Sequence, residues 1–304
     1  MLGLAVAAQG GAAGPSLPLA AGPAGPAIQA PSATAHTLAS TSRPTASFTL
    51  RPPTLRASAA ILVDLDTGAE LYAKRPTDRR PIASLAKVMT GLLVLQRTRL
   101  SDVVTVSPKA AHTPPTDMGL RPWERVRVKD LLYGLLLRSG NDAAVALAER
   151  VSGSVGSFVA LMNRQASILG LTDTYFASPN GLNDRGYSTV RDLGILTRAA
   201  MADPTFARVV STGVYWAPAG RGRYRRMDNI NLFLGQFAGA VGVKTGYTRR
   251  AGDRLAAAAR VGGRSLLAVV LGEPTNTHWI VPFADAAKLL TYGFGPPVRR
   301  PARS

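Results

Sequence analysis

The chain has 304 residues, 46% of them hydrophobic, which is enough apolar material for a sizeable core in one or two domains. It contains no cysteine, which excludes disulfides and thiol catalysis. Its net charge of +18 arises entirely after residue 42 and indicates a generally basic surface, with attraction to an anionic polymer or membrane surface as the second interpretation. The basic residues are scattered, apart from Arg221–Arg226 and Arg299–Arg300, and match no nucleic-acid-binding module, so we expect no nucleic-acid partner.

The N-terminal segment, residues 1–57, is rich in Ala, Gly, Pro and Ser, a composition that cannot build a packed core. We expect it to be disordered. Met1–Ala8 is apolar, and Ala5-Val6-Ala7 resembles a small-residue cleavage site, although no positive residues precede it. A remnant of a signal peptide and a plain linker both fit. No stretch of the chain approaches the roughly 20 apolar residues of a membrane span, so we predict no transmembrane span or C-terminal anchor, and the signal-peptide interpretation would make the chain an exported one.

The first predicted elements are a hairpin and a buried helix. Strands at Ala59–Asp64 and Glu70–Lys74 flank the turn Asp66-Thr67-Gly68, and apolar residues then recur on a helix from Ile82 to Leu95. Ser84 and Lys87, three residues apart, share one face of that helix. A serine hydroxyl becomes a good nucleophile when a neighbouring base takes its proton, and a lysine can do so as a free amine. On this motif alone, an ordinary surface lysine one turn after a helix-start serine is the favoured interpretation.

Residues from about 101 to 235 are predicted to be mostly helical. Within them, Ser139-Gly140-Asn141 separates two apolar helices. The structural interpretation is an ordinary turn, with Gly140 ending one helix and Asn141 or Asp142 capping the next. The functional interpretation is that Ser139 relays a proton to a leaving amine, while Asn141 binds a substrate amide and orients Lys87. The tripeptide fits both.

Three apolar strands are predicted near the end of the chain, at Ala240–Thr245, Arg254–Val261 and Ser265–Leu271, before a last helix over roughly 283–292. The first of these strands ends in Lys244-Thr245-Gly246. Charge and a hydroxyl suit a terminal carboxylate, Gly246 lets a substrate approach the backbone, and an edge strand lets a peptide add as a further strand. A strand-end turn with a solvated lysine is the alternative. Lys244 is also the candidate cation that would lower the pKa of Lys87.

These elements predict an α+β fold in which strands from both ends of the chain form a five-stranded, mainly antiparallel sheet flanked by helices. The predicted domain covers residues 58–295. Its sheet subdomain comes from residues 58–100 and 236–295, its mostly helical subdomain covers about 101–235, and residues 296–304 form a basic tail. The helical insertion would place Ser139 opposite Ser84 across a cleft.

The three motifs, in this order, resemble those of the serine-type D-alanyl-D-alanine carboxypeptidases, which are low-molecular-mass penicillin-binding proteins with a β-lactamase/transpeptidase-like fold. The resemblance runs from about Ser58 to Gly295. It extends to other segments: Ala60–Gly68, Leu71–Lys74, Ala83–Thr90, Ser139–Ala144, Met162–Asn163, Leu169–Leu171, Val243–Thr248 and Ala251–Gly252.

The resemblance implies removal of the terminal D-alanine from peptidoglycan stem peptides through an acyl-enzyme on Ser84, with β-lactams as inhibitors and an anionic cell-wall or membrane surface as a candidate partner. It implies no metal and no cofactor. The implied catalytic residues are Ser84, Lys87, Ser139 and Asn141. Lys244, Thr245 and Gly246 would bind substrate, and the backbone N–H groups of Ser84 and Tyr247 would form the oxyanion hole, which is typically worth ~3 kcal/mol per donor.

One departure concerns an arginine that relatives often carry near the start of the last helix, where it assists carboxylate binding. The corresponding stretch, His278–Phe283, has none; either Arg249, Arg250 or His278 substitutes for it, or Lys244 and Thr245 suffice. Three rival functions remain to be compared with this one. A β-lactamase is disfavoured because none of the four glutamates lies in a Glu-x-x-Leu-Asn context. A non-catalytic wall-binding module is disfavoured by the intact motifs, and a transpeptidase stays open. The three histidines are too scattered for a metal site or a catalytic triad.

Overall fold

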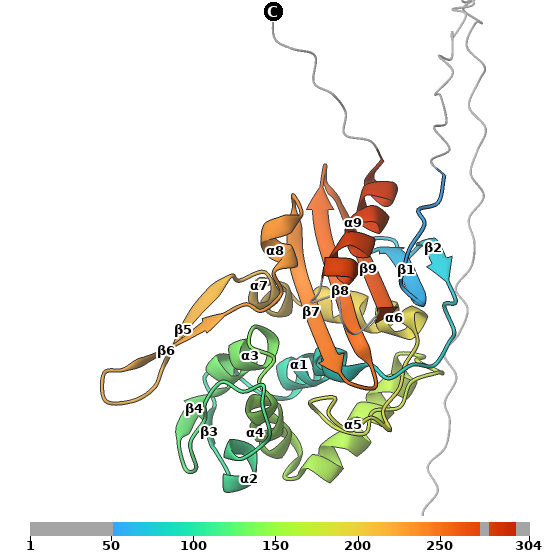
Figure 1. Ribbon diagram of the computed structural model, residues 1–304. Helices are drawn as coiled ribbons and strands as arrows, with labels where there is room; N and C mark the ends of the chain where they lie inside the picture. Colours follow the sequence, from blue (N-terminus) through green and yellow to red (C-terminus); the bar gives the residue numbers. More distant parts are fainter. Residues whose placement is uncertain (1–50, 274–279, 296–304) are drawn as a thin grey trace, which may run out of the picture. The chain divides into compact units, whose positions relative to one another are not determined.

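The computed structural model describes residues 51–273 and 280–295, all within one compact unit (Figure 1). The predictions for residues 1–50, for His278 and for the basic tail lie outside the described residues. The centre of this unit is a five-stranded sheet in the order β2-β1-β9-β8-β7, in which all neighbours are antiparallel. Its strands are β1 (Ala59–Asp64), β2 (Glu70–Lys74), β7 (Ala240–Thr248), β8 (Gly252–Val261) and β9 (Arg264–Glu273). The predicted sheet from both chain ends is confirmed, and β7 is an edge strand.

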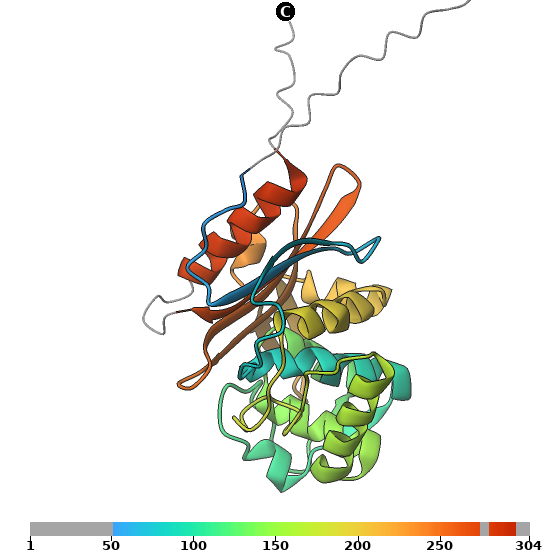
Figure 2. The ribbon, with the colours of Figure 1, turned by 90° about the vertical axis from the view of Figure 1, so that its right-hand side faces the viewer.

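Both faces of the sheet are covered, which explains why β1 is buried along its whole length instead of alternating. Successive side chains of a strand point to opposite faces. Ala60 and Leu62 accordingly join the cluster beneath α9 (Ile280–Phe294), whereas Ile61 and Val63 join the larger core that includes α6 (Val190–Met201). Figure 2 shows α9 on one side of the sheet and most of the other helices on the opposite side, whereas Phe233 of the short helix α8 (Phe233–Gln236) packs in the cluster beneath α9.

The middle of the chain supplies most of the helices, as predicted. Besides α6, they are α1 (Ala86–Arg97), α2 (Pro108–Ala111), α3 (Val128–Leu136), α4 (Asn141–Ser152), α5 (Val155–Ile168), α7 (Pro204–Val210) and α8 (Phe233–Gln236). Side-chain caps fix several of their starts. Ser154 accepts from the N–H of Ser157, and Thr189 accepts from the N–H of Asp192, so each satisfies an otherwise unpaired donor of the first turn.

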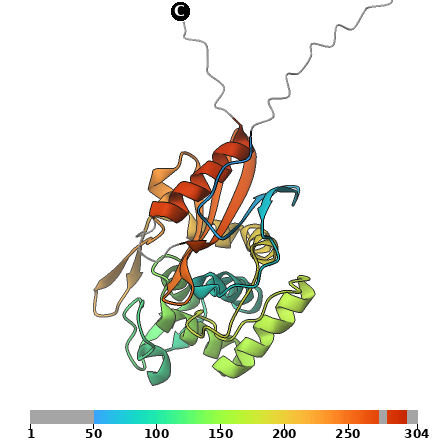
Figure 3. The ribbon, with the colours of Figure 1, turned by 45° about the vertical axis from the view of Figure 1, so that its right-hand side comes forward.

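Two short antiparallel ribbons also lie in this predicted helical stretch. The first pairs β3 (Val103–Thr105) with β4 (Arg125–Arg127), and the second pairs β5 (Val214–Pro218) with β6 (Tyr224–Asp228). The sequence analysis missed both. In Figures 1 and 3 the β5–β6 ribbon projects away from the rest of the unit.

Packing begins slightly before the predicted start at Ser58. Leu55 and Ala57 are buried, and the Ala57 N–H donates to Asp285 Oδ2 of α9 at 2.7 Å. The Lys74 ammonium donates to the carbonyls of Leu55 and Ala57, so this segment is fixed to β2 as well. Among the described residues, no single helix is long and apolar enough to cross a membrane. The consecutive helices α4 and α5 reach that length only together, across an 82° bend.

Candidate active site

Ser84 lies in a short 3-10 turn, η1 (Ala83–Leu85), directly before α1. The prediction that a helix runs from Ile82 is therefore corrected, because α1 begins at Ala86. Ala83 has a φ of +48°, a left-handed conformation that is uncommon for a residue with a side chain. Two glycines close on this turn. A Cβ on Gly246 of β7 would lie 3.0 Å from the Ser84 nitrogen, and a Cβ on Gly181 would collide with the Ala83 carbonyl.

The amine of Lys87 is completely buried beside Ser84. Its Nζ atom lies 2.8 Å from Ser84 Oγ, 2.8 Å from Asn141 Oδ1 and 2.7 Å from the Asn180 carbonyl oxygen. Burial, followed by the positive charge of Lys244, holds the pKa of Lys87 well below its usual value, although the Asp142 carboxylate acts in the opposite direction. The surface-lysine interpretation is wrong. A buried amine at this distance can accept the serine proton.

Lys244 is also buried, with 1% of its surface exposed, so the solvated-lysine alternative is wrong as well. Its Nζ atom donates to the Thr245 carbonyl at 2.9 Å, and burial lowers the pKa of Lys244 to about 7. The residue comes from β7, which pairs with β8 on one side only. An incoming carboxylate would stabilise the charged form of this amine.

Ser139 and Asn141 join α3 to α4 at the floor of the site. Contrary to the prediction for Gly140, Ser139 adopts the left-handed conformation with a φ of +59°, while Gly140 is the N-cap of α4 and Asn141 its first residue. The amide of Asn141 accepts from Lys87 and donates to the Pro114 carbonyl at 3.0 Å. The hydrogen bond between Lys87 and Asn141 therefore supports the prediction that Asn141 orients Lys87.

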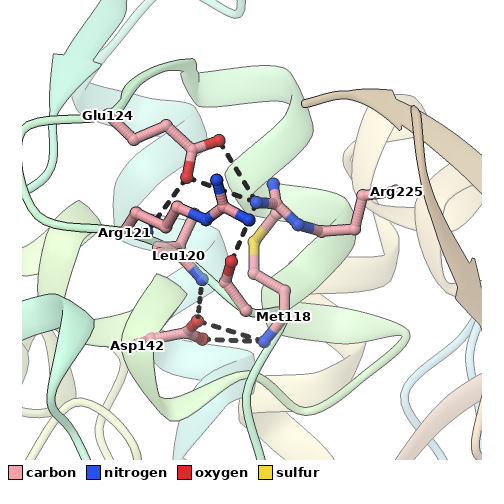
Figure 4. A network of polar contacts seen from close by, with 7 residues as sticks. Met118, Leu120, Arg121, Glu124, Asp142 and Arg225 are labelled. Carbon is pink, nitrogen blue, oxygen red and sulfur yellow. Dashed lines mark hydrogen bonds and ion pairs between the residues drawn. The ribbon is translucent and has the colours of Figure 1, made fainter. Parts of the chain in front are cut away.

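A loop at residues 114–120 forms one wall of the site, and Asp142, the second residue of α4, holds this loop in place. Asp142 is buried and accepts from the backbone N–H groups of Met118 and Leu120 (Figure 4). At the other end of the loop, the Thr116 hydroxyl donates to the Ser139 carbonyl at 2.9 Å, and the Asn141 N–H donates to the Thr116 carbonyl at 2.7 Å. The loop and the Ser139–Asn141 turn thus form one hydrogen-bonded unit.

These elements enclose a cleft of about 540 Å³. It brings together six of the predicted site residues, while Lys87 and Lys244 are buried behind its surface. The lining residues are Ser84, Pro115, Thr116, Ser139, Asn141, Leu182, Ile230, Thr245, Gly246, Tyr247 and Asp253. None of Glu70, Glu124 and Glu149 lines the cleft.

Asn180 is a contact residue that the sequence analysis missed. Its backbone carbonyl accepts from Lys87 and, at 3.5 Å, from the Ser84 hydroxyl. The preceding Pro179 carbonyl accepts from the buried Thr90 hydroxyl of α1 at 2.7 Å, which fixes the loop. The Ser-Pro-Asn-Gly sequence at 178–181 signals a turn, but a backbone carbonyl leaves no side-chain signature of a functional contact.

The candidate substitutes for the missing arginine do not line the cleft. Arg249 and Arg250 are exposed, and Arg250 donates to the Asp184 carbonyl at 3.1 Å, whereas His278 lies outside the described residues. A larger cavity of about 800 Å³ lies elsewhere, lined by three arginines but by no lysine or histidine, so it offers no serine–lysine pair. The part of the chain that the structure describes contains no cluster of His, Cys, Asp or Glu able to hold a metal.

The fold and the serine–lysine pair together define the class of penicillin-recognising serine proteins. The chain belongs to the D-alanyl-D-alanine carboxypeptidase family, whose family model matches residues 46–275. A D-alanyl-D-alanine carboxypeptidase of Bacillus subtilis, DacF, is 35% identical over 244 residues, which cover 78% of this chain and 62% of that protein. The chain therefore spans less than two thirds of the length of this relative.

Two crystal structures resemble the whole described unit. The D-alanyl-D-alanine carboxypeptidase of Mycobacterium tuberculosis H37Rv has a TM-score of 0.78 and 32% identity, covering 83% of this chain and 96% of that one. The Streptomyces K15 DD-transpeptidase has a TM-score of 0.75 and 35% identity, covering 81% of this chain and 99% of that one. The predicted fold and family are confirmed.

Proposed function

We propose that the chain is a serine-type D-Ala-D-Ala carboxypeptidase that removes the terminal D-alanine from peptidoglycan stem peptides and is inhibited by penicillins. The observation that carries the proposal is the 2.8 Å contact between the Ser84 hydroxyl and the buried Lys87 amine. Membership of the family supports the substrate class.

The first half-reaction forms an acyl-enzyme. Ser84 Oγ attacks the carbonyl carbon of the penultimate D-alanine while its proton passes to neutral Lys87 Nζ. The backbone N–H groups of Ser84 and Tyr247 stabilise the negative oxygen of the tetrahedral intermediate. The carbon–nitrogen bond then breaks, and the leaving amine takes a proton relayed from Lys87 through Ser139. Free D-alanine departs, and the ester on Ser84 remains.

The second half-reaction restores the enzyme. A water molecule gives a proton to the same base and attacks the ester carbon. The carbon–oxygen bond to Ser84 breaks, the serine recovers its proton, and the shortened peptide leaves. The burial of Lys87 supports both steps, because it lowers the pKa of the amine and so favours the neutral form that accepts a proton.

Substrate binding falls to the edge of the sheet. Lys244 and Thr245 would hold the terminal carboxylate by charge and hydrogen bonds, and the peptide would run along β7 as an added strand. Gly246 supports this placement, because it lets β7 lie close to the nucleophile. A Cβ atom at this position would lie 3.0 Å from the Ser84 backbone nitrogen, which is tighter than an ordinary van der Waals contact. A side chain there would push β7 away from the nucleophile.

The proposal is tested by measuring D-alanine release from a diacylated L-Lys-D-Ala-D-Ala peptide. We expect release by the unmodified chain, loss of release in Ser84→Ala, and wild-type release in Ser211→Ala, a serine that lies outside this cleft. Equal release by Ser84→Ala and the unmodified chain would contradict the proposal.

A transpeptidase is the second candidate, because one of the similar solved structures is named a DD-transpeptidase. The two activities share the acyl-enzyme and differ in whether water or an amine attacks it. Supplying glycine as an acceptor amine during the same assay separates them. A carboxypeptidase would give mainly the hydrolysed peptide, whereas a transpeptidase would give mainly the peptide joined to glycine.

The location of the chain is part of the proposal. Cell-wall substrates lie outside the cytoplasm, and the cysteine-free composition is compatible with export. We therefore propose an extracytoplasmic enzyme whose catalytic domain covers residues 58–295. Fractionation of cells producing the full chain tests this: recovery with the cytoplasmic contents alone would contradict it.

A further inference from the structure

The β5–β6 ribbon has two different faces, and the candidate active site uses neither. Strand pairing places Tyr215 opposite Met227 and Ala217 opposite Arg225 on one face. The alternate positions form the other face. All four residues of the first face are at least partly buried, so this face is the one that packs on the rest of the unit.

The packed face is fixed at two points. The Tyr215 ring stacks on Tyr133 of α3 with the centroids 3.7 Å apart, and its hydroxyl donates to Asp130 at 2.7 Å. Arg225 donates to both carboxylate oxygens of Glu124 at 3.2 Å, and Figure 4 shows this ion pair beside the 118–124 loop. Because both contacts are on one face, the ribbon is held in place while its opposite face stays free.

The free face is largely aromatic and basic, and its acidic residue, Asp228, pairs with Arg226 at 2.8 Å. Trp216 is 56% exposed and lies opposite Arg226, whose guanidinium lies 5.8 Å from the indole ring centre. Tyr224 is 65% exposed and lies opposite Pro218. Large aromatic side chains on a surface strand add nothing to the core of the protein, so this face needs another explanation.

The turn of the ribbon adds unpaired positive charge. Arg221 and Arg223 are exposed, and neither forms an ion pair with any residue in the described ranges. The compact basic run noted in the sequence therefore lies at the tip and outer edge of a projecting ribbon. A third exposed aromatic residue, Trp123, is 69% exposed in the loop to which the ribbon is bonded.

We propose that this outer surface, defined by Trp216, Arg221, Arg223, Tyr224 and Arg226, docks the enzyme on an anionic lipid membrane. Tryptophan and tyrosine rings settle at the level of the lipid headgroups, with their apolar bodies inward and their polar groups in water. Arg221 and Arg223, which have no ion-pair partner among the described residues, pair with lipid phosphates and respond to the negative surface potential. A hydrated anionic wall polymer would satisfy the arginines but offers no apolar layer for the aromatic rings.

Docking in this way would hold the cleft near the lipid surface. Ile230, which lines the cleft, follows β6 by two residues, and its N–H donates to the Leu137 carbonyl at 3.1 Å. The base of the ribbon and the wall of the cleft are thus neighbouring parts of one segment. The inference concerns a different surface from the catalytic cleft and does not depend on the proposed activity.

The test is co-sedimentation of the full chain with vesicles made of equal parts phosphatidylglycerol and phosphatidylcholine, with pure phosphatidylcholine as the neutral comparison. We expect Arg221→Gln/Arg223→Gln to weaken binding to the anionic vesicles about 30-fold, from the usual contribution of two arginines near such a surface. The matched control is Arg97→Gln/Arg99→Gln, two exposed arginines with the same spacing at the end of α1. It removes the same charge and should leave binding nearly unchanged.

A second variant separates lipid contact from charge. Trp216→Ser/Tyr224→Ser keeps the net charge, and we expect it to weaken vesicle binding by about tenfold or more, because each ring loses its apolar environment. Trp216→Phe should keep most of the binding but lose part of the tryptophan fluorescence quenching by brominated lipids. Thermal unfolding and acylation by penicillin should match the unmodified chain, which shows that these variants fold.

Three results would overturn the proposal. Equal losses in the Arg97/Arg99 control and the Arg221/Arg223 variant would show attraction by overall charge only. Unchanged binding in both ribbon variants would place the contact elsewhere. Binding to an isolated anionic wall polymer but not to the anionic vesicles would replace the lipid by that polymer.

Discussion

Replacing Lys87 by arginine separates the proton-accepting role of this side chain from its hydrogen bonds. Arginine keeps hydrogen-bond donors that could contact Asn141 and the Asn180 carbonyl, but its guanidinium stays protonated in proteins and cannot take the Ser84 proton. A general base typically contributes 10²–10⁴-fold to the rate. Since Lys87 Nζ is the basic nitrogen at 2.8 Å from Ser84 Oγ, we expect Lys87→Arg to lose about that whole factor, equivalent to ~3–5 kcal/mol of activation free energy.

The assay is the second-order rate of acylation by a fluorescent penicillin, followed on gels at several drug concentrations. Lys87→Met serves as the matched control. Methionine has nearly the same length, but it lacks the amine and therefore removes both the proton acceptor and its hydrogen bonds. It gives up three hydrogen bonds but also the cost of burying an amine, so we expect its free energy of unfolding to change by no more than ~2 kcal/mol. Both variants should be equally slow. Acylation of Lys87→Arg within about tenfold of the unmodified chain would refute the assignment of Lys87 as the base.

Three further perturbations test other parts of the account. Burial lowers the pKa of Lys244 to about 7, so the affinity for a peptide with a free terminal carboxylate should fall as the pH rises above about 7. The matching peptide with a C-terminal amide should not show this loss. Inhibition constants measured for both peptides across that pH range check the prediction. The same lowered pKa means that the unfolded chain binds more protons between about 7 and 10.5, so the free energy of unfolding should rise with pH in that window, as denaturant titrations can measure. Gly181 has a φ of +80°, and a Cβ atom there would collide with the Ala83 carbonyl, so we expect Gly181→Ala to lose at least ~2 kcal/mol in stability and to be acylated more slowly. Gly235→Ala is the control, because nothing lies near its Cβ position. Equal free energies of unfolding in the two variants would contradict the predicted strain. Asp142→Ala removes the acceptor of the Met118 N–H and should cost ~2–4 kcal/mol by chemical denaturation, while a change below ~0.5 kcal/mol would show that the loop does not depend on it.

Much of the sheet could be predicted from the sequence because four of its strands are mostly buried, and because the more exposed β2 follows β1 across a recognisable turn. Ala59–Asp64 and Glu70–Lys74 have the predicted bounds, and the later strands differ from prediction by at most three residues at an end. Continuous apolar runs bounded by turn residues are the strongest signal that a strand can give. The motif residues were found from their spacing and from the apolar elements beside them, because Ser84 lies just before α1, Asn141 begins α4 and Lys244 lies within β7.

The β5–β6 ribbon was missed because its exposed face carries tryptophan, tyrosine and arginine in place of simple polar residues. The alternation of apolar and polar residues that marks a half-buried strand is therefore absent from Val214–Pro218. Local shape near Ser84 escaped prediction for a different reason. A 3-10 turn with a left-handed Ala83 depends on the glycines of two distant segments that pack against it, and such contacts leave no local pattern.

The central claim is that Ser84 is the nucleophile of a penicillin-sensitive acyl-transfer site. Intact-protein mass spectrometry over time after addition of benzylpenicillin, with peptide mapping of the adduct, tests it most directly. We predict one drug molecule per chain, attached to Ser84, persisting for many minutes, and no adduct in Ser84→Ala. A retained covalent adduct in Ser84→Ala, or no adduct on the unmodified chain, would contradict the account.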